Sequence, residues 1–302
     1  MEIVFLGTSG CIPTETRNLA SVLIRYLGEP YLFDCGEGTQ RQMRFAKINF
    51  MKIDHIFLTH LHADHFLGLG GMIQSMDFLE RNRPLHIYGP IGTERTINGL
   101  VNLGTFKLES FEIKVKEVEE GLVYDGGNFT VSCAPTVHTR GSVAYCFEEK
   151  PHRRFLKKKA LSLGIPEGRL FSRLQDGHEV KVGDKVFKPD DVLSNPMQGR
   201  KVVYTGDTKA SDSVIRLAEA ADILIHEATF AEDDVDNTRD AFHSTTKQAA
   251  LVAKRANVDA LYLIHFSQRY TESDKLEEEA REIFENSYVA EDLMTVKLKK
   301  HW

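Results

Sequence analysis

The stretch Thr59-His60-Leu61-His62-Ala63-Asp64-His65-Phe66 decides how the rest of this chain is interpreted. It places three imidazoles and one carboxylate within six residues, directly after the apolar run Ile56-Phe57-Leu58. That run is typical of a buried strand, and the apolar spacing from Phe66 to Leu79 predicts a helix. Imidazole and carboxylate are ligands of zinc, or of a similar divalent ion such as manganese. The stretch therefore predicts a metal site on a turn between a strand and a helix.

A polar turn with solvated histidines is the alternative for this stretch, but the spacing of the ligand types is specific enough to favour metal binding. The four ligand-type side chains also exceed what one tetrahedral zinc ion needs once other parts of the chain contribute. This excess indicates two metal ions.

Composition indicates an ordinary globular protein. The 302 residues are 42% hydrophobic and 27% charged, which suffices to bury a large core. No apolar run has the length of a membrane span, and Met1 to Leu6 is typical of a strand rather than of a signal peptide. The four scattered cysteines form no Cys-x-x-Cys pair, so we expect reduced thiols in a cytoplasmic protein. A formal net charge of −6 by itself argues against a nucleic-acid partner.

Strand and helix patterns alternate on both sides of an irregular segment. Strands are expected at 2–6, 21–25, 31–34, 53–58, 85–88, 129–134, 143–147, 201–205, 223–225, 260–264 and 295–298. Helices are expected at 39–46, 66–79, 92–103, 211–221, 246–256 and 275–284. Residues 150–197 are basic, then rich in Gly and Pro, with little strand periodicity. We predict an α/β fold in one domain, 1–302, that carries an inserted arm at about 150–197.

Three further ligand-type residues directly follow apolar strands. His138, Asp207 and His265 each come after one of the expected strands. Sites in layered α/β folds collect at the carboxyl ends of strands, so these residues and the first stretch should meet at one edge. Taken singly, each histidine fits a core position and Asp207 fits a turn after Gly206. Together with the first stretch they favour a shared metal site.

The complete pattern resembles the metallo-β-lactamase superfamily and, within it, the short form of the ribonuclease Z family. The likeness spans nearly the whole chain and rests on the metal motif together with these segments: Phe5-Leu6-Gly7-Thr8-Ser9-Gly10, Phe33-Asp34-Cys35-Gly36-Glu37-Gly38, Tyr204-Thr205-Gly206-Asp207-Thr208, His226-Glu227-Ala228-Thr229-Phe230, His243-Ser244-Thr245-Thr246 and His265-Phe266-Ser267-Gln268-Arg269-Tyr270. The resemblance implies a four-layer αβ/βα sandwich with two zinc ions. It implies that one ion is held by His60, His62 and His138, the other by Asp64, His65 and His265, with Asp207 between them.

His243 is the candidate donor of the proton that a phosphodiester leaving group needs. It precedes an expected helix whose start carries Thr245 and Gln248 at capping-box spacing. We expect the positive end of that helix to disfavour the imidazolium form. Glu227 could hold the ring, although a loop histidine and a structural glutamate remain the alternative. The resemblance implies that these two residues form a proton shuttle.

Other carboxylates have roles that the sequence leaves open. Asp64 is a candidate both as metal ligand and as acceptor of the water's proton, and the sequence does not separate these two roles. Asp34 and Glu37 are candidates to orient the histidine ligands, with plain turn or helix-start roles equally open.

The inserted arm is locally basic. From Lys150 to Arg173 there are eight basic residues and one acidic residue, Glu167. Such clusters favour phosphate backbones, although a solvated helix face is the common alternative. The RNA-binding candidates here are Lys150, Arg153, Arg154, Lys157, Lys158 and Lys159. The resemblance implies an arm that clasps the tRNA elbow, and a homodimer.

A second set of RNA-binding candidates is Arg17 and Asn18. They end the segment Pro13-Thr14-Glu15-Thr16-Arg17-Asn18, which resembles a family pattern with Lys where this chain has Glu15. That departure concerns the treatment of a 3′-terminal CCA and does not touch the metal ligands.

The resemblance thus implies a zinc-dependent endoribonuclease that removes 3′ trailers from precursor tRNA, cutting after the discriminator and leaving a 3′-hydroxyl. One rival is another hydrolase of the superfamily, acting on a small phosphodiester, thioester or lactone, which would need no basic arm. The other is an RNA-binding protein with a relict metal site. The complete ligand set and His243 argue against that second rival.

Overall fold

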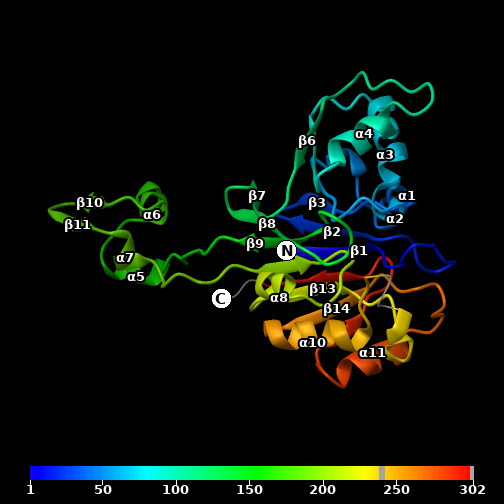
Figure 1. Cartoon of the computed structure of the whole chain (residues 1–302). Coiled ribbons are helices and arrows are strands. Elements are labelled where there is room, and N and C mark those ends of the chain that lie inside the picture. Colours follow the sequence, from blue (N-terminus) through cyan, green and yellow to red (C-terminus); the bar gives the residue numbers. More distant parts are fainter. Residues whose placement is uncertain (238–241, 300–302) are drawn as a thin grey trace. The chain divides into compact units, whose positions relative to one another are not determined.

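Two seven-stranded sheets form the framework of this computed structural model, which describes residues 1–237 and 242–299 (Figure 1). The first sheet has the strand order β16 (Thr295–Lys297), β1 (Glu2–Gly7), β2 (Ser21–Tyr26), β3 (Glu29–Phe33), β4 (His55–Phe57), β5 (Leu85–Gly89) and β6 (Ile113–Glu117). The second has the order β15 (Ser287–Val289), β14 (Ala260–Ile264), β13 (Ile223–Glu227), β12 (Lys201–Tyr204), β9 (Val143–Glu149), β8 (Phe129–Pro135) and β7 (Gly121–Asp125).

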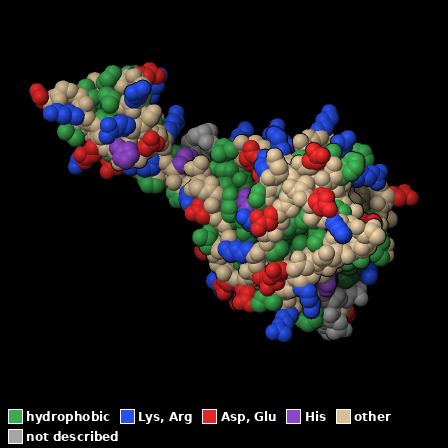
Figure 2. Space-filling model, turned by 90° about the horizontal axis from the view of Figure 1, so that it is seen from above, with side chains coloured by type: hydrophobic (Ala, Val, Ile, Leu, Met, Phe, Trp, Pro, Cys, Tyr) green, Lys and Arg blue, Asp and Glu red, His purple; other side chains and the backbone are tan. Residues whose placement is uncertain are grey.

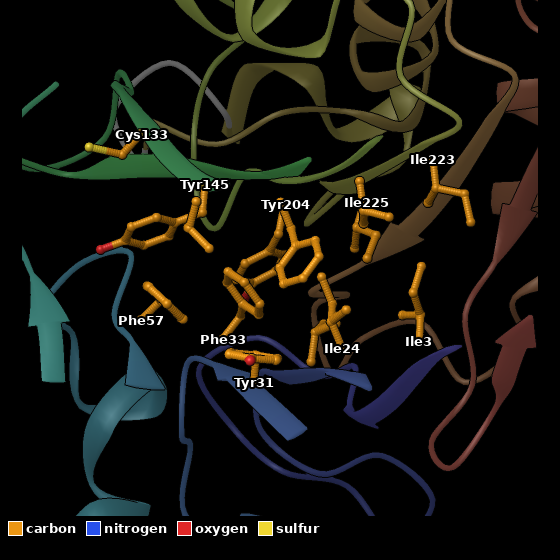
Figure 3. Close-up of a cluster of buried hydrophobic side chains, with 14 of the residues drawn as sticks. Ile3, Ile24, Tyr31, Phe33, Phe57, Cys133, Tyr145, Tyr204, Ile223 and Ile225 are labelled. Atoms are coloured by element: carbon orange, nitrogen blue, oxygen red, sulfur yellow. The ribbon is translucent and has the colours of Figure 1, made fainter. Parts of the chain in front are cut away.

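Aromatic side chains fill the space between the two sheets (Figure 3). Phe33 and Phe57 stack with ring centroids 4.9 Å apart, and Tyr145 of the second sheet lies 5.5 Å from Phe57. Successive residues of a strand point to opposite faces. In β12, Tyr204 therefore lies in this inner cluster, whereas Val203 lies in the cluster on the outer face.

Helices cover the outer face of each sheet. The first sheet is covered by α1 (Thr39–Phe45), α3 (Gly68–Phe78) and α4 (Thr93–Val101). The second is covered by α8 (Asp212–Ala218), α10 (Thr246–Ala256) and α11 (Asp274–Arg281). Short 3₁₀ helices lie at η1 (Phe50–Lys52) and η2 (Glu232–Asn237). The four layers confirm the predicted αβ/βα sandwich. Within the described ranges, no helix has both the length and the apolar character to cross a membrane.

The helix expected at 66–79 is divided. α2 (Ala63–Phe66) begins within the ligand stretch, and α3 follows after Leu67. A Cβ atom on Gly68 would lie 2.1 Å from the carbonyl oxygen of Gly36, so only glycine permits this close approach. The ligands Asp64 and His65 therefore lie on a helical turn rather than in a loop.

Residues Glu149–Arg200 form a separate compact unit, and Met1–Glu148 with Lys201–Lys299 form the other. The bounds lie close to the 150–197 expected for the inserted arm. This second unit contains α5 (Lys157–Ser162), α6 (Arg169–Gln175), the hairpin β10 (Val180–Val182) and β11 (Lys185–Phe187), and α7 (Pro189–Val192). Its own core consists of Ala160, Ile165, Leu174, Val180, Phe187 and Val192. The segment is thus more regular than its sequence pattern predicted.

A buried ion pair closes the base of the second unit. Arg200 donates from Nε to Glu149 Oε2 and from Nη2 to Oε1, each at 2.6 Å. Both side chains are less than one-tenth exposed. The two ends of the unit also approach closely at Gly199. A Cβ atom there would lie 2.1 Å from the Glu149 carbonyl oxygen, so only glycine permits this approach.

Candidate metal centre

Strand ends of both sheets supply the cluster of ligand-type side chains. His60 and His62 follow β4, and Asp64 and His65 lie on α2. His138 follows β8, Asp207 follows β12 and His265 follows β14. All seven of the predicted ligands are brought to one place, as their positions after strands predicted.

Asp207 lies in the middle of this cluster. Its Oδ2 is 3.2 Å from His265 Nε2, 3.6 Å from His60 Nε2 and 3.7 Å from His138 Nε2. Its Oδ1 is 3.4 Å from His65 Nε2. One carboxylate therefore faces histidines of both expected ligand sets.

The ligand atoms form groups of suitable size for a metal ion. His60, His62, His138 and Asp207 make one group, and Asp64, His65 and His265 make another, each with its ligand atoms within 4.8 Å of one another. Across the first group, His138 Nε2 lies 3.1 Å from His62 Nδ1. Across the second, His65 Nε2 lies 3.3 Å from His265 Nε2.

The chemistry of these donors fits a cation. Among the described residues, His60 Nε2 and Asp207 Oδ1 are buried and have no hydrogen-bond partner. Burial lowers the pKa of His60, His62 and His138, which keeps these rings in the neutral form that binds metal. Burial alone would raise the pKa of Asp207. The surrounding histidines have the larger, opposite effect and lower this pKa to well below its usual value. His65 differs, because burial lowers its pKa but the carboxylates of Asp207 and Asp34 raise it more, to well above its usual value. Imidazoles gathered around a carboxylate are a donor set for divalent zinc or a similar metal, whose binding would displace the proton of His65.

Asp34 orients one of the ligands from behind. Its fully buried carboxylate accepts hydrogen bonds from the Thr59 backbone N–H at 2.7 Å and from the Tyr204 hydroxyl at 2.7 Å. Nδ1 of His65 lies 2.7 Å from Asp34 Oδ2, which turns Nε2 of that ring toward Asp207. Of the two carboxylates considered for this role, Asp34 has the contact and Glu37 is exposed.

Sequence reasoning missed the residues that support His265 and Asp64. Thr229 Oγ1 lies 2.9 Å from His265 Nδ1, and the Cys11 N–H donates to Asp64 Oδ2 at 2.8 Å. A Cβ atom on Gly10 would lie 2.6 Å from the His265 ring, so only glycine at this position leaves room for the imidazole of His265. Gly10 and Thr229 belong to segments that carry the family resemblance, but the sequence alone does not show which residues they contact.

His243 and Glu227 form a pair beside the ligand cluster. His243 Nδ1 lies 2.8 Å from Glu227 Oε1, and that carboxylate also accepts from the Thr208 N–H at 2.9 Å and from the Thr229 hydroxyl at 2.7 Å. Burial lowers the pKa of His243, but the charge of Glu227 and their hydrogen bond raise it more, to about 9. The imidazolium form can therefore donate a proton at neutral pH.

The expectation that the following helix disfavours the imidazolium of His243 is wrong in its net direction. The capping box itself is confirmed: Thr245 Oγ1 accepts from the Gln248 N–H, and Gln248 Oε1 accepts from the Thr245 N–H. The full charge of Glu227, at hydrogen-bond distance, outweighs the partial charge of a helix end.

Arg17 and Asn18 make contacts within the protein. Arg17 donates from Nη1 to Thr8 Oγ1 at 2.6 Å and to the Ala290 carbonyl at 2.7 Å, and its guanidinium lies over the Phe266 ring. The Asn18 side chain donates to the Glu37 carbonyl at 2.9 Å. These contacts give both residues a role in holding their loop, and RNA binding by them stays a prediction.

The six RNA-binding candidates of the second unit are exposed or half-buried, and Arg153 and Lys157 among them form ion pairs. Figure 2 shows both basic and acidic side chains on this unit. Arg153 lies 2.6 Å from Asp190 and Lys157 lies 2.5 Å from Glu167. The remaining candidates, Lys150, Arg154, Lys158 and Lys159, are exposed.

Models of two protein families match parts of the chain. The family described as anti-Pycsar protein Apyc1 matches residues 1–156. The family described as beta-lactamase superfamily domain matches residues 179–266, which include Asp207, His243 and His265.

Several named proteins are similar to the chain over nearly its whole length. The chain is 47% identical over 301 residues to ribonuclease Z of Methanothermobacter thermautotrophicus, covering 100% of this chain and 98% of that protein. It is 43% identical to ribonuclease Z of Methanosarcina acetivorans, covering 99% and 98%. Among solved structures, the human short-form tRNase Z superposes with a TM-score of 0.71 at 28% identity, covering 99% of this chain and 100% of that one. The metallo-beta-lactamase fold protein YhfI of Bacillus subtilis, at 21% identity with a TM-score of 0.70 and 98% of each chain covered, shares the fold.

Proposed function

The chain belongs to the ribonuclease Z family of endoribonucleases, within the metallo-β-lactamase superfamily, and we propose that it removes 3′ trailers from precursor tRNA by zinc-dependent hydrolysis. The cut follows the discriminator nucleotide and leaves a 3′-hydroxyl on the tRNA. The observation that carries the proposal is the convergence of seven ligand-type side chains with the His243–Glu227 pair beside them.

The proposed cofactor is a pair of zinc ions, with manganese as a substitute. His60, His62 and His138 would hold one ion, Asp64, His65 and His265 would hold the other, and Asp207 lies where it could contribute to both groups. When bound there, the ions supply an activated water and stabilise the charge on the phosphodiester oxygens.

The chain's own residues move the protons. Asp64 accepts the proton of the attacking water. His243 donates its proton to the leaving oxygen, which is O3′ of the discriminator nucleotide, so that the tRNA ends in a hydroxyl. Glu227 holds the ring of His243 and keeps it protonated before the cut.

Basic side chains of the second unit bind the phosphates of the tRNA outside the cleaved bond. Lys150, Arg154, Lys158 and Lys159 are exposed, and Arg153 and Lys157 exchange their ion pairs for phosphate contacts. Binding of this kind weakens steeply as salt concentration rises.

A cleavage assay on labelled precursor tRNA tests this function. Wild-type protein with zinc should make a single cut after the discriminator, and His62→Ala should lose it. His86→Ala, a half-buried histidine outside the ligand groups, is the matched control and should keep it. Failure of the wild type to cut tRNA, with turnover of a small phosphodiester retained, would move the function to another hydrolase of the superfamily.

We further propose that the protein is a homodimer, paired through a groove beside α1 and α3. The groove has a volume of about 850 Å³ and is lined by Arg44, Phe50, Phe78, Leu79 and Phe106, among others. Phe78 is 85% exposed and Leu79 is 53% exposed. Neighbouring apolar side chains with such exposure are typical of a surface that another protein covers. A second copy of the chain is the occupant that the family resemblance implies.

Sedimentation velocity tests the dimer. Phe78→Asp should convert the dimer to a monomer, because it places a charge in the apolar contact. Leu251→Asp, on the exposed side of α10, is the control and should stay dimeric. A wild-type protein that is monomeric at micromolar concentration would contradict the proposal.

A further inference from the structure

Phe242 is an exposed aromatic residue at the edge of the metal centre. Its side chain is 45% exposed, although it directly precedes the buried His243. Its carbonyl oxygen lies 3.1 Å from Nδ1 of the ligand His138. The backbone of Phe242 therefore orients a ligand, while its ring lies at the surface close to the reacting groups.

The backbone conformation of Phe242 is one that a bulky residue seldom adopts. Its φ is +56°, in the left-handed region where a side chain costs free energy. Strain of this kind is kept at sites where the surroundings require it, and here the carbonyl contact with His138 fixes the residue. The contact with His138 explains the backbone conformation at this position. It does not explain why the side chain is an exposed aromatic ring.

Lys209 brings a positive charge to the same ring. Its Nζ lies 4.5 Å from the centroid of the Phe242 ring, and its backbone N–H donates to the Val137 carbonyl at 3.0 Å. Lys209 is two residues after Asp207, and Val137 is next to His138. The lysine and the ring are therefore both anchored next to metal ligands.

Phe230, the other phenylalanine beside His243, makes a useful contrast. Its ring lies 6.1 Å from that of His243, but it is 8% exposed and has Arg269 above it. Phe230 is thus a supporting residue, whereas Phe242 offers its ring to solvent.

We propose that Phe242 and Lys209 form a platform on which one nucleobase next to the scissile phosphate stacks, with Lys209 contacting the backbone phosphate beside it. This proposal rests on the proposed action on RNA. An aromatic ring with a neighbouring cation is the usual chemistry of single-stranded nucleic-acid sites. Stacking accepts every base, so the platform positions the strand and sets little sequence preference.

A double-mutant cycle between protein and RNA tests the platform. Precursor tRNA is prepared with an abasic nucleotide either just before or just after the cut. With wild-type protein, one of the two abasic substrates should lose about ten-fold in kcat/KM, the size expected for one lost stack. Phe242→Ala should lose a similar factor on the normal substrate and show no additional loss on that abasic substrate.

Companion variants separate stacking from damage to the site. Phe242→Tyr keeps the ring and should retain the abasic penalty, whereas Phe242→Leu keeps bulk without the ring and should lose it. Lys209→Met should weaken binding of both normal and abasic RNA by the same factor. Zinc content of each purified variant reports whether the centre is intact.

The outcomes distinguish the two proposals. Wild-type cleavage of tRNA in which the effects of Phe242→Ala and of both abasic sites multiply independently would overturn the platform alone. Absence of tRNA cleavage by the wild type would overturn the proposed function and the platform with it.

Discussion

At the scale of single residues, the charge of Glu227 decides how His243 ionises. Burial alone would favour the neutral ring, but the carboxylate 2.8 Å away raises the pKa of His243 to about 9. The protonated form therefore persists through neutral pH and is lost as the pH rises through that value. A donor of this kind is already charged when the substrate arrives.

We predict that Glu227→Gln moves the alkaline limb of the kcat profile to lower pH. The substitution removes the charge that raises the pKa of His243 and leaves the burial that lowers it, so less imidazolium is present at pH 8. We expect kcat at pH 8 to fall by at least about ten-fold, with a smaller loss at pH 6. Glu272→Gln, an exposed glutamate, should keep the wild-type profile. An unchanged alkaline limb in Glu227→Gln would assign the proton donor to another group.

Single residues also mark how far the sequence could predict the site. The convergence of the candidate ligands was predicted because His60, His138, Asp207 and His265 come soon after apolar strands and His60 begins a run of ligand-type residues, which are local patterns that one sequence displays. The contacts of Asp34 with Tyr204 and of Thr229 with His265 join residues far apart in the chain, so only the fold reveals them. The pKa of His243 was predicted in the wrong direction for the same reason, because the distance to Glu227 was not visible.

At the scale of elements, the second unit depends on a small core and on the pair that closes its base. Its strands β10 and β11 have three residues each, too short to show a period in the sequence, which is why the hairpin was not predicted. The strands β6 and β7 of the main sheets were missed as well. Their residues are mostly exposed or half-buried, so apolar alternation is weak there.

We predict that Arg200→Ala loosens the second unit. The substitution removes two charge-assisted hydrogen bonds from the buried Glu149 carboxylate, a change that costs on the order of 3–5 kcal/mol. Limited proteolysis should then cut within residues 149–200 faster than in the wild type. Lys157→Ala breaks the exposed pair with Glu167, worth about 0–1 kcal/mol, and should change little. Equal cleavage rates for the two variants would show that the buried pair does not hold the unit.

At the scale of the whole molecule, the candidate metal centre takes its ligand-type side chains from both halves of the sandwich. Four ligands follow β4 of the first sheet, and His138, Asp207 and His265 follow strands of the second. Ions bound to both sets oppose separation of the sheets, so metal binding should contribute to the stability of the fold.

We predict that metal removal destabilises the protein as well as inactivating it. Saturation at about 1,000 times the dissociation constant contributes about 4 kcal/mol per ion, provided the unfolded chain binds weakly. Calorimetry should therefore show a lower melting temperature after treatment with a chelator and recovery after zinc is added. His62→Ala should show a smaller difference between the two conditions. Identical melting curves with and without metal would show that metal binding does not contribute to the stability of the fold.

The root of the second unit has a consequence for how such enzymes diversify. The chain leaves the second sheet at the end of β9 and re-enters it at the start of β12, where Glu148 and Lys201 are paired neighbours in the sheet. An insertion whose two ends already meet imposes no strain on the sheet, whatever its length. Replacing the segment by another of different length should therefore leave the two sheets and the ligand cluster in place and, under the proposed function, change only how RNA is bound away from the cleaved bond.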